Sequence, residues 1–346
     1  MTNASAMTAL ATLNSISKSM DATQNQISTG YRVATASDNA AYWSIATTMR
    51  SDNSAMSTIS DALGLGAATI DVQYTALTNT VNSLTKIKDD LVAATQGGVD
   101  KAKLQDDITA QQAYLRSVAK GATFNGENWL SVDSTSAAYG KTKTTAAGFT
   151  RSATGAITIT TVNIDISNVS LMDNKPVSAT AGPTGAGKGI LDKSYTPSVA
   201  GGKAASIVST DADAAADAAT IAAFVPSATA TAPTLKGTGI NIAFLTNSAA
   251  DQAVLNGYIE VADKALAAVT KAASQVGAVK TQIDSTKTFV STLMDSVDRG
   301  IGQLVDADMD KASTKLKALQ VQQQLGIQAL SIANGNSQNI LSLFRS

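Results

Sequence analysis

The sequence contains no cysteine and no histidine among its 346 residues. It therefore lacks thiol nucleophiles, the usual zinc ligands and every Ser-His or Cys-His catalytic arrangement. Aromatic residues make up only 4% of the chain, whereas Ala, Ser and Thr are abundant. Small side chains favour close contact between helices over a bulky globular core. These absences remove those kinds of catalysis but leave a carboxylate-only hydrolase possible by composition, and we expect no metal site and no cofactor.

Charge and hydropathy exclude two further classes of partner. The formal net charge is −1, so no overall field predicts binding to nucleic acid or to an anionic membrane. No stretch of 18 apolar residues occurs, which predicts no membrane insertion. The first basic side chain is Lys18, unlike a cleavable secretion signal with its basic start. We expect any export to follow a route that reads a different signal.

All five prolines lie in the middle third of the chain. Because proline interrupts helices, both flanks remain compatible with long helices. We interpret 131–250 as a separate, surface-exposed outer domain with a mixed α/β fold. Isoleucines and valines between 157 and 166 predict β structure there. We further expect a short helix over 211–224 and a strand over 239–244. The prolines are Pro176, Pro183, Pro197, Pro226 and Pro233.

Two runs of apolar residues with an uninterrupted spacing of seven flank this middle. Such a spacing marks one face of a helix that packs lengthwise against other helices. The first helix, over 42–91, would reach roughly 75 Å, which suits a rod. We expect 31–130 and 251–304 to form a rod-like helical bundle with a small β-turn region near 124–127. The runs are Tyr42, Met49, Met56, Leu63, Ile70, Leu77, Leu84 and Leu91, then Leu255, Ala262, Val269, Val276, Ile283, Val290, Val297 and Leu304.

The two ends of the chain share a different pattern. Apolar and small residues alternate at steps of three and four over 3–29 and 309–340, which predicts a helix at each end. Only Lys18 and Asp21 are charged between 1 and 31, and only Lys317 and Arg345 between 316 and 346, whereas an exposed helix needs a charged face. We therefore expect 1–30 and 305–346 to form inner coiled-coil core helices that are buried against other copies of the chain. The predicted interface residues are Leu10, Leu13, Met20, Ile27, Leu316, Leu319, Leu330, Ile340, Leu343 and Phe344.

Three short motifs lie in the two flanks of the chain. The stretch 25–46, NQISTGYRVATASDNAAYWSIA, holds S-T-G-x-R before A-x-D-[DN]-A-A, an F-N-G turn follows at 124–126, and 328–344 ends in L-S-L-F. These motifs resemble the N-terminal signature, the turn and the closing pattern of bacterial flagellin of the alphaproteobacterial, rhizobial-like type. The resemblance covers about 1–130 and 255–346 and leaves out the middle. The signature residues are Ser28, Thr29, Gly30, Arg32, Ala36, Asp38, Asn39, Ala40 and Ala41.

The resemblance implies a fold, a function and a set of partners. It implies a mainly α protein with paired N- and C-terminal long helices and a variable outer domain. Its function would be to polymerise, as a homopolymer or mixed with related flagellins, into the extracellular filament that drives swimming. It implies export of the unfolded chain through the flagellar type III apparatus with a chaperone, and assembly at the tip beneath a filament cap, above the hook–filament junction.

The sequence leaves other functions open. A hook–filament junction adaptor also has paired terminal helices, although such proteins usually lack the signature at 28–41. An enzyme in the central domain would need a catalytic constellation, and Asp165, Asp173 and Asp192 have no spacing that suggests one. The segment 84–92 resembles the part of flagellin that animal Toll-like receptors read. Lys86 replaces the usual Arg there and lacks its planar fork, so we expect weak contact with innate immune receptors.

Overall fold

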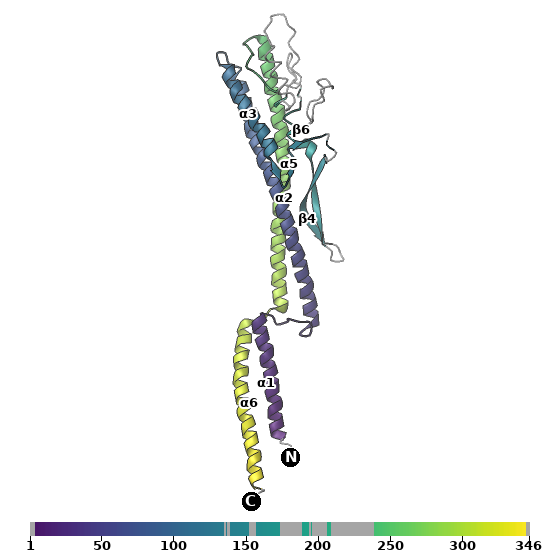
Figure 1. The fold of residues 1–346 in the computed structure, drawn as a ribbon, viewed down its shortest axis with the longest axis vertical. Helices are drawn as coiled ribbons and strands as arrows, with labels where there is room; N and C mark the ends of the chain where they lie inside the picture. The colour runs from purple at the N-terminus through teal and green to yellow at the C-terminus, as the bar shows by residue number, and fades with distance from the viewer. Residues whose placement is uncertain are drawn as a thin grey trace. The chain divides into compact units, whose positions relative to one another are not determined.

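The computed structural model describes residues 4–134, 136, 139–151, 157–173, 189–193, 195, 206–208 and 239–343. Long helices form both flanks of the chain and short strands lie between them (Figure 1). The predicted fold class, mainly α with a mixed insertion, is confirmed. The chain divides into two compact units, Met1–Thr58 with Val290–Ser346, and Ile59–Phe289.

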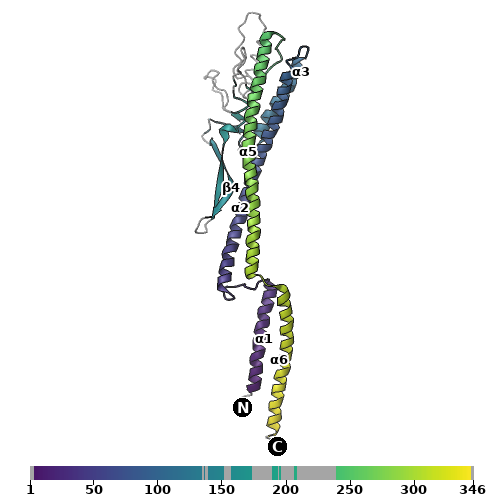
Figure 2. The same ribbon diagram turned by 180° about the vertical axis from the view of Figure 1, so that it is seen from behind.

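The first unit contains a pair of terminal helices. Helix α1 (Ala4–Thr29) and helix α6 (Met309–Leu343) lie side by side, as two opposite views show (Figures 1 and 2). Both ends are therefore helical, as the steps of three and four predicted. Gly326 faces α1, where a Cβ would lie 2.9 Å from Leu13 Cδ1. This close approach fits a seam of small and apolar residues.

The first unit also holds the start of α2 (Ala40–Ala93) and the end of α5 (Ala249–Val305). A small apolar cluster joins these helix ends to the linker that precedes α2. One polar bond lies beside it, from Asn53 Nδ2 to Asp298 Oδ1 at 2.6 Å. The buried members are Val33, Ala46, Ile301 and Val305, with Met49, Val297 and Leu304 packed against them.

The second unit is built on the remainder of α2 and α5, with α3 (Lys101–Gly121) beside them (Figure 1). Here the residues spaced by seven face inward. Ion pairs between α2 and α5 flank them, from Lys88 Nζ to Asp263 Oδ1 at 2.6 Å and from Lys280 to Asp71. The residues at 0% exposure are Leu63, Ile70, Leu77, Leu84 and Leu91 on α2, and Leu255, Ala262, Val269, Val276 and Ile283 on α5.

The predicted tight turn lies between two very short strands, β1 (Thr123–Phe124) and β2 (Glu127–Asn128). Its central residues have positive φ, +49° at Asn125 and +80° at Gly126. Asn and Gly tolerate this backbone conformation best, and hairpins with two-residue loops require it. The prediction of a turn here is confirmed.

An antiparallel hairpin, β4 (Thr142–Arg151) with β5 (Ile157–Asp165), packs on the helices of the second unit. The predicted β structure between 157 and 165 is confirmed. The hairpin touches α2 at Gly66, where a Cβ would lie 2.6 Å from Thr145 Oγ1 and 3.1 Å from Ala146 O. It also touches α5, because the rings of Phe149 and Phe289 stack with centroids 6.3 Å apart.

The rest of the described centre is a stack of short parallel segments. Strand β3 (Ser131–Val132) pairs with β6 (Met172–Asp173), just after a short 3₁₀ turn, η1 (Ile166–Asn168). Next, Leu191 N donates to Leu171 O, and Leu191 O accepts from the N–H groups of Ile207 and Val208. The buried side chains of the stack are Leu130, Leu171, Met172, Ile190, Leu191, Ile207 and Val208.

The predicted strand over 239–244 is wrong. Only Gly239 pairs, in a single parallel bridge with Ser206. Two glutamines of α3 bind the backbone groups that a neighbouring strand would otherwise bind. Gln105 Oε1 accepts from Ile242 N at 2.7 Å, and Gln112 Nε2 donates to Ile240 O at 3.1 Å. The helix predicted over 211–224 lies outside the described residues.

Candidate subunit interface

The linkers on either side of the terminal helix pair are bonded to each other. Arg32 N donates to Val305 O at 2.6 Å, and Ala307 N donates to Gly30 O at 2.8 Å. Tyr31 and Asp306 form an antiparallel bridge between these bonds. Gly30 ends α1 with φ +74°, a left-handed conformation that favours glycine. This joint lies between the end of α1 and the start of α2, and between the end of α5 and the start of α6.

Side chains of the flagellin-like signature hold the joint. The Arg32 guanidinium donates to Leu304 O at 2.9 Å and lies 5.9 Å from the centroid of the Tyr42 ring. Asp38 Oδ2 accepts from the N–H groups of Ala34 and Thr35 at 3.1 and 2.9 Å. These bonds, led by those with Thr35, lower the pKa of Asp38, so its carboxylate remains charged at neutral pH.

Two further side chains act as helix caps at the joint. Asn39 Oδ1 accepts from the N–H groups of Ala41 and Tyr42, both at 3.1 Å, and so caps the start of α2. On the other linker, Asp308 Oδ1 accepts from Lys311 N at 3.1 Å at the start of α6. Backbone bonding to Lys311 lowers the pKa of Asp308. The signature residues Ser28 and Thr29 are exposed at the end of α1, where Thr29 Oγ1 donates to Asn25 O at 2.7 Å.

Most of the predicted interface residues lie in the seam between α1 and α6. Each is at least half-buried in the single chain, apart from Leu10, which is 50% exposed. The side chains of Ile340 and Leu343, and all of Phe344, lie outside the described residues. Whether these residues also contact other copies stays a prediction. The seam positions are Leu13, Met20, Ile27, Leu316, Leu319 and Leu330.

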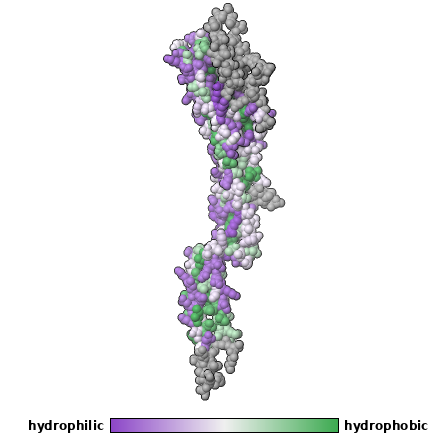
Figure 3. All heavy atoms as spheres, viewed as in Figure 1, coloured by the Kyte–Doolittle hydropathy of each residue, from purple (hydrophilic) through white to green (hydrophobic). Residues whose placement is uncertain are grey.

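Helix α6 carries a second apolar stripe that faces away from the seam. Val321, Leu325 and Ile332 are 56%, 58% and 66% exposed. At about 100° per residue, Leu325 and Ile332 lie within about 40° of Val321, whereas Leu319 and Leu330 lie about 160–180° away. Figure 3 shows hydrophobic residues on the surface formed by the terminal helices. An exposed apolar stripe of this kind marks a surface for association.

Sequence reasoning missed this stripe because the stronger period of the seam hid it. On α1, Met7 joins Leu10 as an exposed apolar residue, at 59%. The signal that could have found the α6 stripe is a second set of apolar residues, at 321, 325 and 332, opposite the first. A helical stretch that is apolar on two faces and has no charged residue, as 318–343 does, has little surface suited to water.

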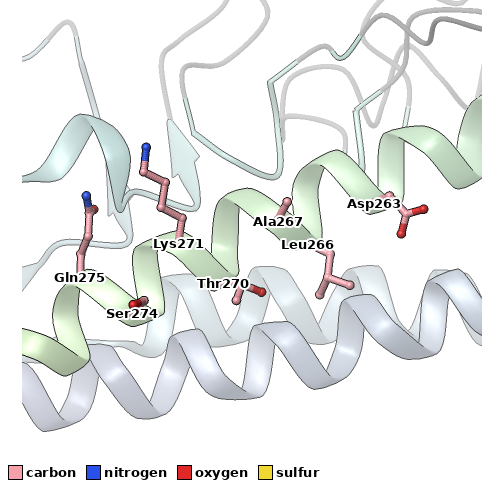
Figure 4. Close-up of a pocket in the computed structure, with 7 residues that line it drawn as sticks. All are labelled: Asp263, Leu266, Ala267, Thr270, Lys271, Ser274 and Gln275. Carbon is pink, nitrogen blue, oxygen red and sulfur yellow. The ribbon is translucent and has the colours of Figure 1, made fainter.

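A surface hollow of about 620 Å³ lies along α5 and is open to solvent (Figure 4). Within the described ranges, no three His, Cys, Asp or Glu side chains gather as metal ligands do, and no helix is long and apolar enough to span a membrane. The hollow is lined by Asp263, Leu266, Ala267, Thr270, Lys271, Ser274 and Gln275.

Paired helices from the two ends of one chain, with an apolar stripe left uncovered, define a self-associating helical structural protein. Family models agree, since the bacterial flagellin N-terminal helical region matches residues 1–135 and the C-terminal helical region matches 259–344. The chain belongs to the bacterial flagellin family and is a structural subunit of the flagellar filament.

Several rhizobial flagellins are similar along the whole chain. Flagellin C of Rhizobium meliloti (strain 1021) is 44% identical, and the match covers 100% of this chain and 98% of the relative. Flagellin A of the same strain is 42% identical, with 100% and 99% covered. The flagellin of Brucella melitensis biotype 1 is 38% identical, with 100% and 98% covered. These matches include the middle of the chain, which the motifs at its two ends did not reach.

Proposed function

We propose that the subunit polymerises by burying the exposed stripe of α6, together with the exposed start of α1, against neighbouring copies. The observation that carries this proposal is the exposure of Val321, Leu325 and Ile332 on a stretch of α6, 318–343, that has no charged residue. Full burial of one such side chain contributes about 1.5–3 kcal/mol. Repeated over many contacts, this gain drives assembly once a growing end exists.

The same surface accounts for slow nucleation. Helices with weakly apolar faces are marginal when isolated, because tertiary packing supplies most helical stability. A segment that orders on binding loses roughly 2–5 kcal/mol or more of its interaction energy to that ordering. A preformed filament end supplies both neighbours at once, so elongation is fast where nucleation is slow.

We propose the remaining partners from the family membership. The chain passes unfolded through the flagellar export apparatus with a chaperone, and it assembles outside the cell at the tip, beneath the cap. It forms a homopolymer or a mixed filament with related flagellins, attached through the hook–filament junction. It has no enzymatic activity. Innate immune receptors contact it weakly, since Lys86 is exposed but lacks the bidentate geometry of arginine.

We also propose that the layers of the filament correspond to the three parts of the chain that the sequence pattern predicts. Residues 1–30 and 305–346 form the inner core, 31–130 and 251–304 form the helical bundle around it, and 131–250 lie outermost. Limited proteolysis of filaments and monomers tests this division. Cleavage near residues 30 and 305 in monomers, with protection in filaments, is expected. Equal cleavage of both forms would contradict it.

Seeded elongation, followed by electron microscopy, tests the role of the stripe. Leu325→Glu places a charge at its centre, and Ser331→Glu places the same charge at an exposed polar position of the same helix. We expect Leu325→Glu to lower the elongation rate at least tenfold and Ser331→Glu to have a much smaller effect. Equal rates for both variants would remove the stripe from the assembly mechanism.

The unmodified chain distinguishes the filament subunit from the junction adaptor. A filament subunit elongates seeds of its own kind without limit, whereas an adaptor adds a short layer and stops. We expect filaments whose length grows with added subunit. A folded, soluble chain that never elongates seeds would favour the adaptor.

A further inference from the structure

The apolar stripe of α6 contains one polar side chain. At about 100° per residue, Gln328 lies about 20° from Val321 and about 40° from Ile332 around the helix axis. Gln328 is exposed, as are the apolar residues on either side of it. Between positions 321 and 332 it is the one polar residue within about 40° of Val321. The stripe is therefore apolar except at this amide.

The exposed start of α1 has a similar pattern. Asn14 lies about 20° from Met7 and about 40° from Leu10 around the helix axis. Met7 and Leu10 are 59% and 50% exposed, and Asn14 is exposed as well. Each of the two terminal helices therefore presents apolar side chains together with an amide on an exposed face.

The two amides lie at the same level of the helix pair. In the seam, a Cβ at Gly326 would lie 4.0 Å from Ile16 Cδ1. Asn14 lies two residues before Ile16 in α1. Gln328 lies two residues after Gly326 in α6. Because α1 ends and α6 begins at the joint, the helices run in opposite directions (Figures 1 and 2), and both offsets, of about 3 Å, point away from the joint.

The two amides also face opposite sides of the pair. Asn14 lies about 160° around α1 from Ile16, and Gln328 lies about 160° around α6 from Gly326. Within the described ranges, neither amide forms a hydrogen bond with the chain, so both are left to water in the monomer. A buried amide without a partner loses those bonds, whereas two facing amides replace them, because each has an NH₂ donor and an oxygen acceptor.

We propose that Gln328 of one copy pairs with Asn14 of a neighbouring copy and thereby determines the register of the subunit contact. The partner is a second copy because the chain is a filament subunit. The contact joins the α6 stripe of one copy to the exposed start of α1 of the next. Such a contact between two different surfaces leaves one of each free for further copies, as an open helical polymer requires. The inference rests on the proposed assembly through the α6 stripe.

The pair supplies what the apolar stripe lacks. Apolar contacts are not directional, so the stripe alone permits one helix to slide along another. A slide of one helical turn, about 5.4 Å, separates the two amides and leaves each of them covered without a partner. A single polar residue in an apolar helix contact specifies register in this way, at a cost in stability.

Cysteine crosslinking tests the pairing, because the chain has no thiol of its own. Filaments of the double variant Asn14→Cys with Gln328→Cys are treated with a short bismaleimide, and we expect covalent ladders of several copies on denaturing gels. The control is Asn14→Cys with Gln320→Cys, because Gln320 is exposed on the same helix but lies about 12 Å from Gln328 along the axis. The control should give no ladder.

Two crosslinking results would overturn the pairing. One is a ladder as strong from the control as from the first variant. The other is a crosslinked dimer from Asn14→Cys alone, since two α1 faces would then meet each other. Filaments of the first variant that give no ladder would equally exclude the contact.

A second measurement reads the register itself and does not need cysteine. Gln328→Leu keeps the stripe apolar, so we expect seeded elongation to continue while the filament loses its single repeat, seen as lost layer lines in electron micrographs. Gln320→Leu should keep the layer lines. Unchanged layer lines in Gln328→Leu would overturn the inference. If Leu325→Glu slows elongation in the same assay, the stripe stands and only the register is lost; if it does not, the proposed function itself fails.

Discussion

Gly326 of α6 lies so close to Leu13 of α1 that a Cβ at position 326 would be 2.9 Å from Leu13 Cδ1. Gly335, in the same helix, has no atom within 4 Å of its Cβ position. The two glycines therefore allow a matched comparison. One lies in the seam between the terminal helices, and the other faces open space.

Comparing Gly326→Val with Gly335→Val distinguishes the effect of packing in the seam from the effect of helix propensity. Both substitutions place the same β-branched residue in one helix, so the propensity terms are similar. Gly326→Val additionally requires the Leu13 side chain to shift in the seam between α1 and α6, and overpacking costs about 1–3 kcal/mol. We expect Gly326→Val to lower monomer helicity, measured by circular dichroism, and to slow seeded elongation. Equal behaviour of Gly335→Val would show that the seam tolerates the added bulk.

The docking of the β4–β5 hairpin on α2 depends on Gly66. Gly66→Ala would place its Cβ 3.1 Å from the backbone oxygen of Ala146, and the hairpin must shift to admit it. Gly64 lies one half-turn away, where the nearest atom is Lys287 Nζ at 4.0 Å. Gly64→Ala should stabilise α2 by about 0.5–1 kcal/mol. We expect opposite signs for the two variants in urea unfolding, and a stabilising Gly66→Ala would contradict the close contact.

Burial of the residues spaced by seven predicts a large difference between two leucines of α2. Leu77 is 0% exposed and Leu65 is 55% exposed. Leu77→Ala should lower the free energy of unfolding of the second unit by about 2–5 kcal/mol, because it leaves a cavity. Leu65→Ala should change it by about 0.5 kcal/mol or less. Chemical denaturation of monomers measures both, and similar values would rule out a core along this face.

The pH dependence of stability follows from Asp192. Burial raises its pKa to about 6 in the folded state, against about 3.9 when unfolded. The folded protein therefore binds the proton at Asp192 more tightly, and the contribution of this group to stability increases as pH falls from about 7 to about 4. The difference corresponds to on the order of 3 kcal/mol. Thermal unfolding across this range should show the gain, and Asp192→Asn should remove it; a flat wild-type profile would argue against a destabilising buried charge at Asp192.

Periodic packing was predictable from the sequence because each helix repeats one physical requirement many times. Every seventh residue from Leu63 to Leu91 is buried in the core. With so many repeats, one unusual residue would not obscure the pattern. The turn at Asn125 and Gly126 was equally predictable, because few other residues adopt positive φ. Gly30 and Arg32 were found only as a resemblance, since nothing local shows that Arg32 reaches a carbonyl on the other side of the fold.

Other elements could not be predicted because distant partners determine them. The segment 239–244 has a strand-like composition, but Gln105 and Gln112 of α3 bind its backbone instead of a strand. Strand β4 is rich in Thr and Ala and has no clear alternation of apolar and polar residues. It forms because it pairs with β5 and packs against α2 at Gly66. The bond from Asp173 N to Asp192 Oδ2 is likewise invisible in the sequence, where 18 residues separate the two positions.

The joint between the linkers connects residues that are far apart in the chain. The Arg32 guanidinium binds a carbonyl 272 positions later. When a polypeptide is exported with its N-terminus first, Arg32 can bind Leu304 O only after almost the whole chain has emerged. Contacts of such long sequence separation form late, because a large loop must close first. A prematurely ended copy consequently has no Leu304 or Val305 to close the joint, and completeness of the chain becomes a condition for joining its neighbours.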